Sequence, residues 1–102
     1  MKNNTVETLW DRRDKLGIFA EIMEAAKGNQ GKTRIMYSVN LSFTQVNDYL
    51  SFLTKMGFIE VHKENNRKTY ETTIKGENYV KNYVEMSQLL SPQEVEAPVI
   101  MS

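Results

Sequence analysis

The chain has 102 residues, 13 basic and 13 acidic side chains, no cysteine and one histidine. This composition supports one modest domain and excludes disulfides, zinc–thiolate sites, iron–sulfur clusters and thiol nucleophiles. Because no apolar run reaches the roughly 20 residues that span a bilayer, and the first residues lack a signal peptide's apolar stretch, we expect a soluble cytoplasmic protein without membrane, metal or cofactor.

The first predicted helix starts near a capping-box-like pair, Thr8 and Asp11, and stops at Gly28. Leu9–Trp10 add apolar content at its front. Further along, apolar residues recur at spacings of three and four, so they share one face: Leu16, Phe19, Ala20, Met23 and Ala26.

Two more helices are predicted in close succession. One covers Lys32–Val39 and ends at Asn40, a residue type that tolerates the left-handed conformation of a helix end. The next starts at the capping box Ser42–Gln45 and ends at Gly57. Its apolar stripe is Val46, Tyr49, Leu50, Leu53 and Met56. The short connection is typical of a helix-turn-helix.

Two β-rich runs, Phe58–Lys63 and Lys68–Thr72, flank a polar Asn65–Asn66 turn, which predicts a two-stranded hairpin. Thr73 is expected to cap a last helix that reaches about Leu90. Three helices, a hairpin and a helix are the order of a winged helix. We therefore predict a mainly helical α+β domain over residues 1–92 and a flexible tail at 93–102.

Several separated motifs follow one another over about residues 13–85. They are Lys32-Thr33-Arg34-Ile35-Met36-Tyr37 with Asn40-Leu41-Ser42, then Tyr49-Leu50, Leu53, Gly57 and Ile59, then Tyr70, Thr73 and Lys75-Gly76. In this order they resemble the motifs of the small archaeal winged-helix DNA-binding proteins, a family that includes dimeric chromatin-associated proteins of crenarchaea. The resemblance implies a winged-helix fold, DNA as the ligand and a dimer, although the last helix is shorter than in members whose long C-terminal helices pair as a coiled coil.

The charges are unevenly distributed. Residues 27–75 carry eight basic side chains against four acidic ones, whereas both flanking segments are net acidic. Lys32, Thr33 and Arg34 open the second helix, where cations and free N–H groups can hold a DNA phosphate; the alternative is a solvated helix start. The predicted wing carries Lys63, Arg67 and Lys68, which suit phosphate or minor-groove contact, or else serve solubility.

The polar face of the third helix is a candidate for the major groove of DNA. Its outward residues include Thr44, Gln45, Asn47, Ser51 and Lys55. Asn and Gln can bond adenine, and Thr can contact a thymine methyl group. Because Gln45 also serves the capping box, we favour Thr44, Asn47 and Ser51 over it. The alternative is a plain solvated face, since Lys55 is the only cation there and Asp48 opposes it.

The last helix, about residues 73–91, has more apolar surface than one small core can bury. The residues concerned are Tyr79, Val80, Tyr83, Val84, Met86 and Leu90. Such a surplus indicates a partner surface, and we predict that this helix joins two copies in a homodimer.

The predicted function is binding of double-stranded DNA by a homodimer, as a transcriptional regulator or a small nucleoid-associated chromatin protein. The alternative is a winged-helix module that binds another protein, as the thin basic content of the third helix would allow. No enzyme is expected, because His62 has no evident partner for nucleophilic catalysis and reads as a strand residue rather than a metal ligand. Gly28–Thr33 is not expected to be a nucleotide-binding loop, because Ala26 stands where its first glycine is needed.

Overall fold

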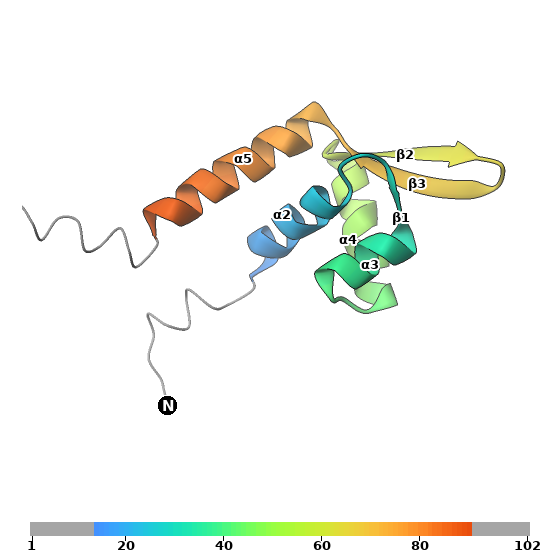
Figure 1. The fold of residues 1–102 in the computed structure, drawn as a ribbon, viewed down its shortest axis with the longest axis horizontal. Helices are drawn as coiled ribbons and strands as arrows, with labels where there is room; N and C mark the ends of the chain where they lie inside the picture. Colours follow the sequence, from blue (N-terminus) through green and yellow to red (C-terminus); the bar gives the residue numbers. More distant parts are fainter. Residues whose placement is uncertain (1–13, 91–102) are drawn as a thin grey trace, which may run out of the picture.

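The computed structural model describes residues 14–90, which form a mainly helical winged-helix fold, as predicted (Figure 1). In chain order the elements are α2 (Lys15–Ala25), β1 (Gln30–Gly31), α3 (Lys32–Val39), α4 (Phe43–Lys55), β2 (Ile59–Glu64), β3 (Arg67–Thr72) and α5 (Ile74–Leu89). The β2–β3 hairpin projects at one end of the molecule, and α5 runs beside α2 toward the other. Within 14–90 no helix is long and apolar enough to cross a bilayer. The predictions for Thr8–Trp10, Asp11 and the tail at 93–102 lie outside the described residues.

The described part of the first predicted helix starts at Asp14, whose carboxylate accepts the backbone N–H of Gly17 at 2.8 Å and caps α2. Four of the five residues predicted for its inner face are buried: Phe19, Ala20, Met23 and Ala26. The prediction for Leu16 is wrong, because this second residue of α2 lies outside the buried cluster and its side chain is 55% exposed. Ile22, which the pattern did not single out, is fully buried.

The helix-turn-helix is confirmed with its end signals. Asn40 is left-handed (φ 55°, ψ 51°) and ends α3 as predicted. Ser42 and Gln45 form the predicted capping box at the start of α4: the Ser42 hydroxyl accepts the Gln45 N–H at 3.1 Å, and the Gln45 side-chain oxygen accepts the Ser42 N–H at 3.0 Å. Gly57 (φ 85°) follows the end of α4, as predicted. The prediction that Met56 belongs to the apolar stripe is wrong, because this residue is the C-cap of α4 and its side chain is exposed.

The wing is a hairpin of β2 and β3 with Asn65 and Asn66 as its two-residue turn. Both have positive φ (52° and 64°), which asparagine adopts more readily than most residues and which suits the twist of the two strands. The sheet also has a third strand that the sequence did not predict: β1 pairs antiparallel with β3, with Gln30 opposite Tyr70 and Gly31 opposite Thr69. This strand ties the start of α3 to the base of the wing.

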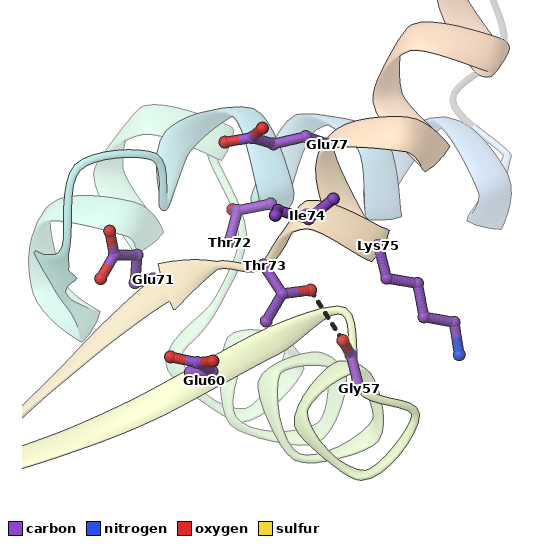
Figure 2. A pocket seen from close by; sticks show the side chains of 8 residues that line it. All are labelled: Gly57, Glu60, Glu71, Thr72, Thr73, Ile74, Lys75 and Glu77. Carbon is purple, nitrogen blue, oxygen red and sulfur yellow. Dashed lines mark hydrogen bonds between the residues drawn. The ribbon is translucent and has the colours of Figure 1, made fainter.

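Thr73 connects the wing to α5 and caps it as predicted, since its hydroxyl oxygen accepts the Gly76 N–H at 3.2 Å. The same hydroxyl donates to the carbonyl of Gly57 at 2.7 Å, which holds the start of α5 against the end of α4 (Figure 2). Gly76 is buried at this junction and allows close packing there.

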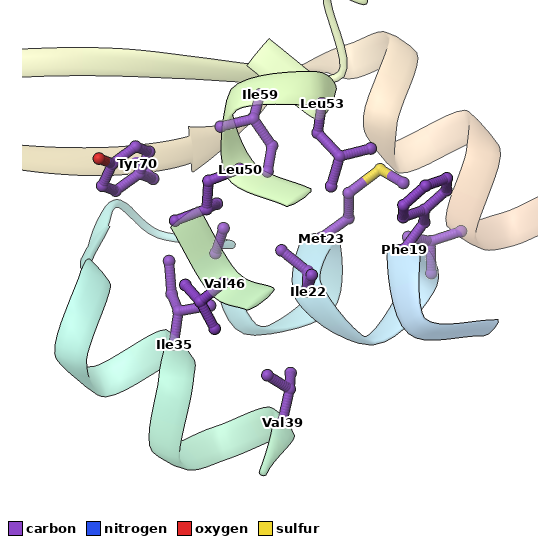
Figure 3. Packing of buried hydrophobic residues seen from close by; sticks show 12 residues of the cluster. Phe19, Ile22, Met23, Ile35, Val39, Val46, Leu50, Leu53, Ile59 and Tyr70 are labelled. Carbon is purple, nitrogen blue, oxygen red and sulfur yellow. The ribbon is translucent and has the colours of Figure 1, made fainter. Parts of the chain in front are cut away.

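The core lies where α2, α3, α4 and the base of the sheet meet (Figure 3). The largest of its fully or nearly fully buried side chains are Ile22, Met23, Ile35, Val46, Leu50, Leu53 and Ile59. Thr72 is the buried polar residue among those described, and its hydroxyl donates to the Met23 carbonyl, so the O–H donor has a partner despite its burial. The core thus fixes β3 to α2 and sets the direction of the wing.

Candidate nucleic-acid interface

A hollow of about 720 Å³ lies between the start of α3 and the wing. It brings together five of the six residues predicted for the DNA backbone: Lys32, Thr33, Arg34, Arg67 and Lys68. Lys63 is exposed on β2 and does not line it. The cause is β1, because its pairing with β3 places the first turn of α3 beside Arg67–Thr69. Residues distant in sequence therefore share one basic surface, named the α3–wing hollow below.

The first turn of α3 offers free backbone N–H groups to this hollow. Its N-cap is Gly31, which has no side chain and forms no side-chain cap. The early N–H groups of a helix have no partner within the helix, and the positive end of the helix dipole adds to their attraction for anions. With Arg34 exposed beside them, they form a surface that suits a phosphate.

Lys32 connects the hollow to α4. Its Nζ donates to the side-chain oxygen of Asn47 and lies 5.2 Å from the centre of the Phe43 ring. Asn47 was predicted to read a base, but its half-buried side-chain oxygen is already occupied by Lys32. No sequence signal could show this pair, because the two residues are 15 positions apart and meet only through the packing of α3 on α4.

The other predicted α4 residues are open to solvent. Thr44, Ser51 and Lys55 are exposed, as is Asp48. Gln45 is exposed too, but its side-chain oxygen is used in the capping box, which leaves the amide NH₂ as the group that can contact DNA. The polar face of α4 thus continues the basic surface of the hollow, with Thr44 and Ser51 as its unengaged hydroxyl groups.

Carboxylates gather at the base of the wing, in a second hollow of about 630 Å³ lined by Glu60, Glu71 and Glu77 (Figure 2). Nε2 of His62 lies 3.2 Å from the Glu71 carboxylate and 3.6 Å from that of Glu60. Within the described residues no cluster of histidine and acidic side chains is suited to a metal ion. These carboxylates do not line the α3–wing hollow. Glu64 lies opposite Arg67 near the tip of the wing, so acidic and basic side chains are separated at the base of the wing but not at its tip.

Half of the predicted dimer surface on α5 is used within the chain. Val80 is buried in the core, and Tyr79 and Tyr83 are half-buried with parallel rings 6.4 Å apart. The Tyr79 hydroxyl donates to the Leu16 carbonyl at 2.8 Å, and burial, followed by the nearby Tyr83 and Asp14, raises its pKa. The exposed apolar residues of its second half are Val84, Met86 and Leu89, followed by the C-cap Leu90. Ile74, at the first position of the helix, is exposed as well.

Sequence reasoning missed five residues that line the α3–wing hollow: Asn29, Gln30, Gly31, Tyr37 and Thr69. Four of them belong to β1 or its surroundings, whose pairing has no local signal. Tyr37 did have one, because it lies four positions after Thr33 and therefore on the same face of α3.

Comparison with known proteins places this geometry in a family. Residues 12–91 match the winged helix-turn-helix family. The uncharacterized protein MJ0287 of Methanocaldococcus jannaschii is 30% identical over 92 residues, which cover 89% of this chain and 91% of that protein.

Solved structures show the same fold. Sso10a-2, a DNA-binding protein from Sulfolobus solfataricus, superposes with a TM-score of 0.69 at 26% identity, over 86% of this chain and 97% of that one. BpsR of Bordetella bronchiseptica, whose DNA binding is regulated by 6-hydroxynicotinic acid, gives 0.69 at 14% identity over 94% and 79% of the two chains. The chain belongs to the winged helix-turn-helix family and, within it, resembles archaeal DNA-binding members.

Proposed function

We propose that the protein binds double-stranded DNA as a homodimer and serves as a non-enzymatic transcriptional regulator or small nucleoid-associated chromatin protein. In this proposal α4 enters the major groove, and the α3–wing hollow holds the flanking phosphates. The observation that carries it is the convergence of Lys32, Arg34, Arg67 and Lys68 on one hollow beside the polar face of α4. The similarity to Sso10a-2 over nearly all of that protein supports the same ligand.

The direct test is titration of the full chain with a duplex of random sequence at about 50 mM salt, where non-specific binders register at micromolar protein. We expect binding that weakens linearly in log affinity against log salt concentration, because each neutralised phosphate releases a counterion. Fluorescence anisotropy of a labelled duplex provides the measurement. An absence of binding at micromolar protein would instead favour a winged-helix module that binds another protein.

The homodimer is proposed on the exposed apolar residues of the second half of α5, whose contact with water is unfavourable in a monomer. An apolar groove of about 330 Å³ between α2 and α5, lined by Val80, Tyr83 and Val84 among others, adjoins them. Pairing through this region would place two α4 helices on one duplex.

The double variant Met86→Glu/Leu90→Glu is expected to be a monomer, because it would place four carboxylates in a two-fold interface. Sedimentation equilibrium measures the mass. The control is Ile74→Glu, which also adds charge at an exposed apolar position of α5, but at its first residue, where a carboxylate suits the helix dipole. A dimer that survives the double substitution would show that α5 does not join the copies.

A further inference from the structure

Tyr37 is a large aromatic side chain that takes no part in the core formed by residues 14–90. It lies on α3 opposite the buried Ile35 and Val39 and is 76% exposed. Within residues 14–90 it belongs to none of the aromatic pairs and none of the cation–π contacts. Its ring therefore has faces available for a ligand.

The surroundings of Tyr37 define which ligand suits it. The ring borders the α3–wing hollow, whose lining includes Lys32, Arg34, Arg67 and Lys68 and, among the described residues, no carboxylate. Its volume of about 720 Å³ is ample for a nucleotide. Proteins bind single-stranded nucleic acid by combining basic side chains, which contact the phosphates of the strand, with exposed aromatic rings, on which the bases stack.

A duplex offers such a ring no base face to stack on, since its bases are stacked on one another and a side chain at the backbone contacts only sugar and phosphate. A single strand presents the base faces that a duplex hides. We propose that the α3–wing hollow also binds single-stranded DNA, with its phosphates on Arg34, Arg67 and Lys68 and an unpaired base stacked on Tyr37. This inference rests on the proposed function only because duplex and single-stranded DNA would use the same basic side chains of the α3–wing hollow.

The test compares oligothymidylate of about eight nucleotides, within the site size of single-strand binders, with an abasic oligomer of equal length. The abasic oligomer has the same phosphates but no bases to stack. We expect the full chain to bind oligothymidylate at least about fivefold more tightly than the abasic oligomer, the lower end of what one stacked base contributes. Equal affinity for the two oligomers would overturn the proposal.

Variants of Tyr37 test whether its ring causes the preference for oligothymidylate over the abasic oligomer. Tyr37→Leu is expected to remove the preference for oligothymidylate, and Tyr37→Phe, which keeps the ring, is expected to retain it. Because the side chain is exposed, both should unfold at the wild-type temperature. A preference that persists in Tyr37→Leu, or is lost in Tyr37→Phe, would show that stacking on this ring is not the cause.

Duplex binding by the same variants separates this inference from the proposed function. Tyr37→Leu should lower duplex affinity by a smaller factor than oligothymidylate affinity, because a duplex offers this ring no exposed base face and the cations that hold its phosphates are unchanged. A wild-type chain that binds oligothymidylate but no duplex would contradict the proposed function and leave the single-strand site in place. A chain that binds duplex but has equal affinity for oligothymidylate and the abasic oligomer would overturn the single-strand site and leave the proposed function in place.

Discussion

Replacing Arg67 and Lys68 together with alanine is expected to weaken duplex binding by roughly 60-fold per protomer at about 0.1 M salt, where each phosphate contact accounts for about an eightfold change. Both side chains are exposed at the rim of the α3–wing hollow, facing the start of α3. Loss of two contacts per protomer should also reduce the slope of log affinity against log salt by about 1.8 per protomer, or about 3.6 for the homodimer. Anisotropy titrations at several salt concentrations measure both quantities.

The matched control is Lys15→Ala/Lys81→Ala, which removes the same charge from exposed positions on α2 and α5. It should change affinity little, because neither lysine lines the hollow and distant charges are screened beyond about 10 Å at 0.1 M salt. If both double variants lost affinity equally, net charge rather than the wing would explain the binding. If neither did, the wing would have no part in it.

The second large effect concerns folding, and we expect Gly76→Ala to destabilise the protein by about 2–3 kcal/mol. A β-carbon at this position would lie 2.6 Å from Cγ2 of Thr72 and closer still to the carbonyl oxygen of Phe58. That oxygen is held by the N–H of Thr73 at 3.0 Å, so it cannot move away without loss of a hydrogen bond. Overpacking of this kind costs about 3 kcal/mol, of which the better helix propensity of alanine recovers up to about 1 kcal/mol.

Thermal unfolding followed by circular dichroism should show the midpoint of Gly76→Ala lowered by roughly 10–20 °C. The control is Gly31→Ala, because a β-carbon there would meet only the Arg67 guanidinium, at 3.9 Å, and φ is already negative at −76°. Its expected loss is below about 1 kcal/mol, the size of an N-cap effect. Equal midpoints for the two variants would contradict the tight packing at Gly76.

The elements whose ends have local chemical signals are those that the sequence predicted well. The left-handed Asn40, the capping box of Ser42 with Gln45 and the Asn65–Asn66 turn each depend on residues within four positions of one another. Short-range hydrogen bonds and backbone preferences decide such features, so the helix-turn-helix and the hairpin could be located without the structure.

The features that the sequence did not show depend on long-range packing. β1 has only two residues, too few for an alternating pattern, and it exists because β3 passes beside it. The hydrogen bond from Lys32 to Asn47 also depends on long-range packing, and it uses a side-chain oxygen that was expected to contact a base. Val80 was expected at the dimer interface, but packing of α5 on the core buries it within the chain. Periodicity indicates which face is apolar, but not whether the chain or a partner covers it.

The third strand also divides the wing into two mechanical parts. β1 reaches only as far as Tyr70 and Thr69, so the base of the wing is three strands wide and is clamped to the core. Beyond it the rungs from Lys63–Lys68 to the Asn65–Asn66 turn are held by two strands alone. The base of the hairpin is therefore rigid and fixes one wall of the α3–wing hollow. The two-stranded tip is more flexible, so it can bend along a curved duplex, or gain or lose residues, without disturbing the base.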